Sequence, residues 1–275
     1  MSDVESDTRP FKRLSKNVVP INYELTVFPN FETSTFSGSV RIEINICNET
    51  DFIEIHSLDL NLSNITFKSG DTVLKNSKLI NVKNCESVDI YFLQKLPSGR
   101  GFLNIDFNGV LNDNLVGFYK TKCLKENGES CIAAVTQFEA AYARKAFPCF
   151  DEPCFKATFD ICIIAEPSKT VLSNMPLRSI VPYENDERFK NFQFERSVIM
   201  STYLVSYVIG HYEHLETVDE LGTLIKLYTP IGKTDLGKFS LDIAVKAVPF
   251  FTKFFGIEYP LPKLDLIGLN DVEIG

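Results

Sequence analysis

The chain has 275 residues, of which 44% are hydrophobic and 23% are charged. This composition is that of a folded protein with one large or two smaller domains, and it excludes an intrinsically disordered chain. The net charge of −8 argues against nucleic acid and anionic membranes as partners, because an acidic protein is not attracted to either.

Residues 1 to 14 are polar, and we expect them to form a disordered tail. They contain no apolar segment of a secretory signal, and no apolar run in the chain approaches the length of a membrane span. Seven cysteines at scattered spacings are more typical of reduced thiols than of a disulfide framework. We therefore expect a cytoplasmic protein with no membrane partner.

Residues 15 to 212 show an apolar period of two, which predicts half-buried strands. The alternating runs are Val40 to Ile46, Val88 to Phe92, Leu103 to Phe107, Phe159 to Ile163 and Tyr203 to Ile209. No amphipathic helix lies between them. The pattern predicts a mainly β fold, with a large antiparallel domain in the form of a sandwich or an open saddle of sheets.

Residues 213 to 275 have a different pattern and predict a second, incomplete domain of the α/β class. A strand at LIKLYTP is followed by a helical run from Asp235 to Phe255, with Gly256 as the expected stop and Pro249 as the expected kink or break. LDLIGL then predicts a buried strand. The apolar helical positions are Leu236, Phe239, Ile243, Ala247, Phe250, Phe251 and Phe254. A strand, a helix and one further strand cannot close a core of their own, so we expect a truncated domain.

The segment VTQFEAAYARKAFPCFDEPCFKATFD, residues 135 to 160, carries most of the chemical signal. It is too irregular for a helix and too charged for a core strand, so we interpret it as an ordered functional loop. Pro148 and Pro153 favour turns. Asp151 is a candidate to cap backbone N–H groups and to pair with Arg144 or Lys145.

This segment closely resembles the one that closes the N-terminal domain of zinc aminopeptidases of the aminopeptidase N family, in particular the puromycin-sensitive type. The resemblance extends to NVVPINY near the start, to GFYKTK and MSTYLVSYVIGHY, and to the run from YTPIGK through YPLPK, which is similar to the start of the family's thermolysin-like catalytic domain. One departure is Tyr142, which stands where close relatives usually have Asp and can alter local ion pairing.

The resemblance implies that Glu139, the Glu of TQFE, helps to hold the substrate's α-ammonium group. It also implies that Gln137 lies at the pocket for the first side chain. A carboxylate is the natural counter-charge for an ammonium group. For a Glu without such a match, a solvated loop charge would be the ordinary interpretation, but the match of the whole segment favours the binding role.

Two other patterns are weaker. Cys149 and Cys154 lack a second cysteine pair, so buried thiols are a better interpretation than a metal or redox site. His211 and His214 do not form the zincin His-Glu-x-x-His motif and follow a strand-like run, which favours exposed residues at a domain end.

We thus predict the N-terminal portion of a zinc-dependent aminopeptidase, whose partners are a peptide substrate and the remainder of the catalytic domain. The zinc ligands, the second amine-binding Glu and the transition-state-stabilising Tyr of the family do not occur in these 275 residues. We therefore expect no catalytic residue, no metal site and no activity in the chain alone. Two alternatives stay open, namely a short peptide-binding or interaction module and a non-functional gene fragment.

Overall fold

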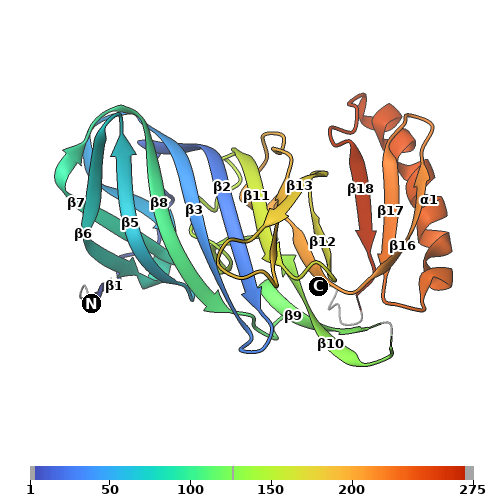
Figure 1. The fold of residues 1–275 in the computed structure, drawn as a ribbon. Helices are drawn as coiled ribbons and strands as arrows, with labels where there is room; N and C mark the ends of the chain where they lie inside the picture. Colours follow the sequence, from blue (N-terminus) through green and yellow to red (C-terminus); the bar gives the residue numbers. More distant parts are fainter. Residues whose placement is uncertain (1–3, 126, 270–275) are drawn as a thin grey trace.

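The fold is built around one large, strongly curved sheet, which lies beside two smaller sheets (Figure 1). The structure is a computed structural model and describes residues 4–125 and 127–269. In hydrogen-bonding order the large sheet consists of β13 (Leu177–Pro182), β14 (Lys190–Phe194), β11 (Thr158–Ala165), β2 (Val18–Asn30), β3 (Thr35–Ile46), β8 (Gly99–Val110), β5 (Asn61–Ser69), β6 (Thr72–Val82), β7 (Ser87–Leu96) and β4 (Thr50–His56), with β1 (Val4–Asp7) beside β6. The predicted mainly β fold is confirmed.

The second sheet has the order β12 (Thr170–Ser173), β15 (Tyr207–Gly210), β10 (Ser130–Gln137) and β9 (Gly117–Leu124). Short 3-10 helices lie at Lys83–Cys85, Ala143–Lys145 and Thr202–Leu204. The last of these replaces the beginning of the strand that was expected from Tyr203, so that β15 starts only at Tyr207. Most pairs are antiparallel, but β11 runs parallel to β2, a direction that alternation of apolar residues does not reveal.

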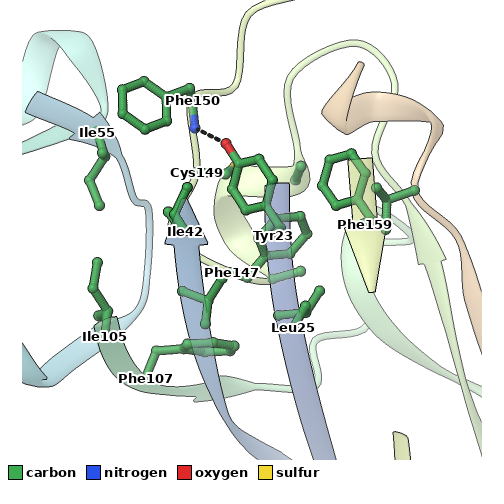
Figure 2. Packing of buried hydrophobic residues seen from close by; sticks show 14 of the residues in the cluster. Tyr23, Leu25, Ile42, Ile55, Ile105, Phe107, Phe147, Cys149, Phe150 and Phe159 are labelled. Atoms are coloured by element: carbon green, nitrogen blue, oxygen red, sulfur yellow. Dashed lines mark hydrogen bonds between the residues drawn. The ribbon is translucent and has the colours of Figure 1, made fainter. Parts of the chain in front are cut away.

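One continuous core joins the large sheet to the loop between β10 and β11. Tyr23 of β2 is fully buried, stacks on Phe159 of β11 at 4.8 Å between ring centroids, and meets Phe147 of the loop edge-on. Ile55 of β4 and Ile105 of β8 belong to the same cluster (Figure 2). The alternating residues predicted for β3, β7, β8 and β11 are buried as expected.

The N-terminal segment was expected to be disordered, but its described part lies against the large sheet. Arg9 places Nη2 2.6 Å from Asp89 Oδ2 and 3.3 Å from Glu54 Oε1. Both carboxylates are buried, and a buried charge requires a counter-charge. This requirement accounts for the position of the polar segment, while the predicted domain boundaries at residues 14 and 212 stay predictions.

The third sheet consists of β16 (Glu213–Val218), β17 (Leu224–Thr229) and β18 (Lys263–Ile267), with helix α1 (Thr234–Phe255) on one face (Figure 1). The helix ends at Gly256, as predicted, in the left-handed conformation with φ of 65°. It runs through Pro249 without a break. β16 was not predicted, and β18 is half-buried rather than buried.

Helix α1 contacts the sheet through a face that the apolar count did not identify. The helical residues buried against the sheet are Gly237, Leu241, Ala244 and Val248. The approach is close at Gly237, where an added Cβ atom would collide with Leu227 Cδ2. Most of the apolar positions counted in the sequence are instead exposed, for example Phe239 at 75% and Phe254 at 69%. The helix therefore presents an uncovered apolar surface.

Candidate functional site

The two candidate binding residues lie where β10 leaves the second sheet. Gln137 is the last residue of β10, and Glu139 follows after one residue. Both side chains are exposed, whereas Phe138 between them is 2% exposed. The Phe138 ring contacts those of Phe147 and Tyr207, each at 6.0 Å between centroids. The buried Phe138 therefore anchors the backbone from which Gln137 and Glu139 reach solvent.

The chain turns immediately after Glu139. The peptide bond between Glu139 and Ala140 is cis. The N–H of Tyr142 donates to the carbonyl of Phe138 at 2.8 Å, and the 3-10 helix Ala143–Lys145 follows. Tyr142 itself is 37% exposed. Gln137, Glu139 and Tyr142 thus lie close in sequence on one compact turn.

An ion pair holds the two ends of the next turn together. Arg144 Nε lies 2.9 Å from Asp151 Oδ2, and both side chains are buried. Arg144 also donates to the carbonyl of Asp151 and pairs with Glu86 at 2.9 Å. The other carboxylate oxygen of Asp151 accepts from Thr202 Oγ1 at 2.6 Å. The predicted pairing of Asp151 with Arg144 is confirmed, while Lys145 pairs with Asp59 instead.

His56, at the end of β4, is an acceptor within this network. Its Nδ1 accepts a hydrogen bond from the N–H of Asp151 at 3.1 Å, and its own backbone pairs with that of Cys149. Burial, followed by the positive charge of Arg144, lowers the pKa of His56 to about 3. A neutral imidazole is required because a protonated Nδ1 could not accept the bond. No sequence pattern pointed to this role.

Further contacts bind the segment to the large sheet. The N–H of Phe150 donates to the hydroxyl of Tyr23 at 3.1 Å (Figure 2). Burial raises the pKa of Tyr23 well above its usual value, so the hydroxyl is neutral. Glu152 accepts from the N–H of Leu14 at 2.8 Å, and Ser201 donates to the carbonyl of Pro153. The loop is therefore rigidly supported from both sides.

Glu139 differs from these charged neighbours. Within residues 4–125 and 127–269, its carboxylate has neither a hydrogen-bond partner nor an ion-pair partner, and the same holds for the amide of Gln137. Arg144, Asp151 and Glu152, by contrast, all have partners. A rigid turn that presents one uncompensated carboxylate can bind a small cationic group.

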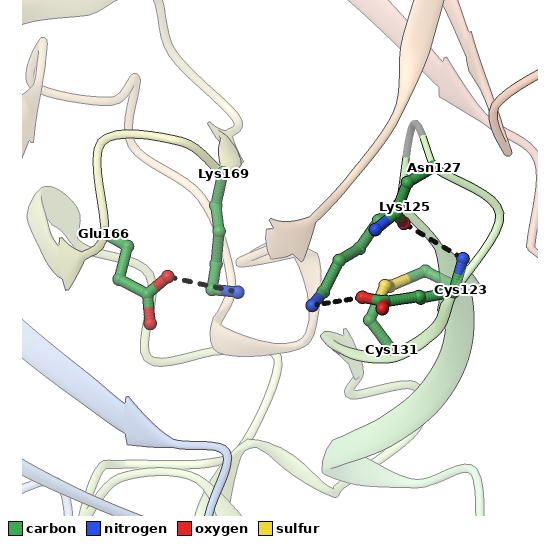
Figure 3. Close-up of a disulfide and its surroundings, with 7 residues drawn as sticks. Cys123, Lys125, Asn127, Cys131, Glu166 and Lys169 are labelled. Carbon is green, nitrogen blue, oxygen red and sulfur yellow. Dashed lines mark hydrogen bonds and ion pairs between the residues drawn. A yellow bond between two sulfur atoms is a disulfide. The ribbon is translucent and has the colours of Figure 1, made fainter.

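The cysteines only partly follow expectation. Cys149 is buried, and burial raises its thiol pKa well above the usual value, but Cys154 is exposed. Cys123 and Cys131 form a disulfide across the β9–β10 hairpin (Figure 3), so the expectation of unpaired thiols is wrong for these two. The Asn127-Gly128 pair between two alternating runs is a hairpin signal that would have brought the two runs, and with them the two cysteines, close together.

The histidines give no metal site in the described part of the chain. His214 lies on β16 opposite Tyr228, is exposed, and has Nε2 3.6 Å from Glu216 Oε2. His211 precedes this strand, and His56 is committed to Asp151. Among residues 4–125 and 127–269 there is no group of three or more His, Cys, Asp or Glu side chains that could hold a metal ion.

Two cavities lie outside the candidate turn. One of about 730 Å³ lies between α1 and the segment through β18, and its lining includes Phe251, Tyr259 and Leu266. A smaller one of about 130 Å³ lies where Lys263 donates to the carbonyl of Ser173 at 2.8 Å. Gln137 and Glu139, which are exposed, do not line either of these two cavities.

Comparison with known families agrees with this arrangement. Residues 19–204 match the peptidase M1 N-terminal domain. This range contains the large sheet from β2 onwards and the whole turn with Gln137 and Glu139. The chain belongs to the peptidase M1 family. The resemblance stated from the sequence is thereby confirmed.

Relatives of this M1 chain are aminopeptidases from plants and animals. It is 38% identical over 263 residues to aminopeptidase M1-B of Oryza sativa subsp. japonica, covering 96% of this chain and 29% of that protein. It is 38% identical to aminopeptidase M1 of Arabidopsis thaliana, with coverage of 96% and 30%. It is 35% identical to puromycin-sensitive aminopeptidase of Caenorhabditis elegans, with coverage of 96% and 28%. The M1 chain thus spans less than a third of the length of these relatives.

A spanning helix is not found in this M1 chain, since none of its described helices combines the length and apolar character that crossing a bilayer requires.

Proposed function

We propose that this M1 chain forms the amino-terminal part of a zinc aminopeptidase and contributes the anchor for the substrate's free amino terminus. The observation that carries the proposal is the exposed carboxylate of Glu139, unpartnered among the described residues, on a turn whose other charges are paired. The aminopeptidase names of the relatives support the substrate class. The ammonium group of a peptide would form a charge-assisted hydrogen bond with Glu139.

Gln137 would contact the first side chain of the peptide. It is exposed at the end of β10 and is separated from Glu139 only by the buried Phe138. An amide can donate and accept hydrogen bonds, so it suits the rim of a pocket that takes side chains of different polarity. Replacing Gln137 with Leu should change the preference among first residues more than the preference for a free amino terminus.

Zinc chemistry would come from outside this chain. In the complete enzyme, zinc would activate the water that attacks the first peptide bond. The described residues do not form a ligand set for it, and we therefore propose that the 275 residues alone are inactive. Glu139 would hold the amino terminus away from the bond that is cleaved.

The remainder of a catalytic domain would cover the apolar face of α1. Leu236, Phe239, Phe250 and Phe254 are 60–78% exposed on this helix, and α1 also borders the 730 Å³ cavity. An uncovered apolar surface of this kind marks an interaction site. The relatives extend well beyond the matched part, so the catalytic remainder is the partner that we propose.

This partnership can be tested by complementation. The portion of the Caenorhabditis elegans relative that lies beyond the match would be co-expressed with residues 1–275. We expect co-purification that is lost in the double variant Phe239→Asp/Phe254→Asp. Leu93→Asp is the control, because Leu93 is 92% exposed on β7, away from α1. Equal loss in the control, or none in the double variant, would reject the interface.

The anchor role needs a test of selectivity. Residues 1–275 would replace the matching part of the same relative, and hydrolysis of peptides with free and acetylated amino termini would be compared. Glu139→Gln should reduce the discrimination between them. Glu187→Gln is a matched control, because Glu187 is also exposed and belongs to a distant turn. Unchanged discrimination in Glu139→Gln would favour a plain interaction module instead.

The cytoplasmic location expected from the sequence also belongs to this proposal. It is supported by five free cysteines among the described residues, which are typical of a reducing compartment. Cell fractionation of the tagged full-length gene product would test it, and enrichment in a membrane or secreted fraction would contradict it.

A further inference from the structure

The hairpin that leads to the candidate turn carries a covalent cross-link. β9 and β10 pair without interruption from Leu124 opposite Ser130 to Gly117 opposite Gln137. Cys123 lies directly opposite Cys131, with 5.0 Å between their Cα atoms, and the two form a disulfide. The cross-link is one residue pair from the end of the ladder that adjoins the connecting loop (Figure 3).

The part of the hairpin near the disulfide has little other support from the sheet. β10 pairs with its second neighbour, β15, only at Ala134 and Val135. Beyond these residues, the connecting loop is held by Lys125, whose N–H donates to the carbonyl of Glu129 and whose Nζ lies 3.1 Å from Glu129 Oε2. That ion pair is exposed and contributes little. A two-stranded ribbon is marginally stable by itself, so the disulfide adds a covalent restraint at an end that β15 does not support.

The other end of β10 carries the proposed binding residues. The strand runs unbroken from Cys131 to Gln137, and Phe138 and Glu139 follow. A shift of register by one residue would turn every side chain to the opposite face. Such a shift would expose Phe138 and bury Gln137. The pairing at Cys123 and Cys131 therefore opposes the displacement that would most disturb Gln137 and Glu139.

We propose that Cys123 and Cys131 are a reversible thiol–disulfide site, oxidised by glutathione disulfide or a similar small disulfide, which holds β10 in the register that presents Glu139. In reducing compartments, protein disulfides are usually transient and redox-sensing. The effect on peptide binding rests on the proposed function, because it requires Glu139 to be the anchor for the amino terminus.

The exchange begins at Cys131, which is half-buried, whereas Cys123 is 2% exposed. The Cys131 thiolate attacks one sulfur of glutathione disulfide, forms a mixed disulfide and releases one glutathione thiolate. Cys123 loses its proton and attacks the Cys131 sulfur, which forms the cross-link and releases the second glutathione. Two protein thiols are oxidised, one glutathione disulfide is reduced to two glutathiones, and the released thiolates take up the protons.

The first test identifies the bond in the 275-residue chain. Cys47 and Cys154 are exposed and would be replaced by Ser, which leaves five of the seven cysteines. After equilibration with glutathione disulfide, we expect three free thiols in the unfolded protein and five after reduction. Tryptic digestion without reductant should link peptides 123–125 and 126–144. Five free thiols before reduction, or a different linked pair, would overturn the proposal.

The second test measures the consequence for the hairpin. Amide hydrogen exchange within residues 117–137 should accelerate about tenfold on reduction, since exchange reports local opening. The Cys123→Ser/Cys131→Ser variant should exchange at the fast rate with or without glutathione disulfide. Cys47→Ser is the control and should keep the response. Equal exchange rates in the oxidised and reduced protein would reject the proposal that the disulfide holds β10 in register, whatever the role of Glu139.

The third test concerns binding, in the chimeric enzyme described above. Reduction should raise the KM for a peptide about threefold to tenfold with little change in kcat, and the double Ser variant should have the higher KM permanently. If the hydrogen-exchange rate depends on redox state but KM does not change, the disulfide stabilises the hairpin without affecting peptide binding. That result would overturn this part of the inference. Loss of selectivity in Glu139→Gln is measured separately, so the failure of the two proposals can be distinguished.

Discussion

Arg144 and Asp151 form a buried ion pair across the Pro-containing turn, with 2.9 Å between Nε and Oδ2. Asp151 also accepts from Thr202 and from the backbone N–H of Arg144. Through the hydrogen bond from Thr202, Asp151 also links this loop to the segment before β15. Arg144 and Asp151 therefore stabilise the conformation of the loop. Glu139 takes no part in these contacts, and its exposed carboxylate can bind a ligand.

Removing one member of this pair should destabilise the fold. Arg144→Met leaves the Asp151 carboxylate buried without its counter-charge, which costs on the order of 3–5 kcal/mol. Thr202→Val removes a single hydrogen bond and should cost about 1–3 kcal/mol. Urea unfolding at pH 7 would measure both. Lys145→Met serves as a comparison, because Asp59, its partner, is exposed, and a loss as large as that of Arg144→Met would contradict this explanation.

His56 predicts a dependence of stability on pH. Its folded-state pKa of about 3 lies below the unfolded value near 6.5. Between these values the unfolded chain binds a proton that the folded protein does not, so the free energy of unfolding falls as pH is lowered. From pH 7 to pH 5 the contribution of this residue is about 2 kcal/mol.

The variant His56→Asn isolates this effect. An Asn side chain does not titrate and can still offer an oxygen to the N–H of Asp151. Its stability should therefore change less between pH 7 and pH 5 than that of the unmodified protein, when both are measured by chemical unfolding. Parallel pH profiles for the two proteins would show that His56 does not titrate on unfolding in this range.

Glu139→Gln should act on binding more than on the chemical step. A charge-assisted hydrogen bond to the ammonium group is worth about 1.5–3 kcal/mol. Because this contact exists in the bound substrate as well as in the transition state, the change should chiefly raise KM and lower kcat/KM by about one to two orders of magnitude. Thermal unfolding should be almost unchanged, since the carboxylate has no partner among the described residues. Unchanged kcat/KM with a lower melting temperature would mean that Glu139 only supports the fold.

Metal analysis provides an independent check. After desalting, the 275-residue chain should not retain stoichiometric zinc, because three histidines distributed over β4, the segment before β16 and β16 itself do not converge. It should also fail to hydrolyse aminoacyl reporter substrates. About one tightly bound zinc per chain would contradict the prediction and direct attention to His211 and His214, whose substitution by Ala would then be the next measurement.

The strands were predictable because their inner faces are apolar at every second residue, as Val40, Ile42 and Ile44 show in β3. The parallel pairing of β11 with β2 was not predictable, since alternation is the same in either direction. In α1, small residues such as Gly237 and Ala244 contact the sheet, so counting large apolar side chains identified a different face of the helix.

In the candidate site, too, some features could be predicted from the sequence and others could not. Glu139 and Gln137 were identified through family resemblance, and both are exposed, as the proposed binding role requires. The acceptor role of His56 depends on a contact with Asp151, 95 residues away in the chain. No local pattern encodes such a contact, and the same is true of Arg9 beside Asp89.

The parallel pairing of β2 with β11 also constrains how the chain folds. Asn22 aligns with Thr158, so this edge of β2 stays open until more than half the chain is available, and an open strand edge is prone to pair with other molecules. Contacts this distant in sequence form slowly. During synthesis, the risk of aggregation is therefore greatest after β2 has been made and before β11 has paired with it. Because the turn that carries Glu139 precedes β11 in the chain, this turn must form before β11 can pair with β2.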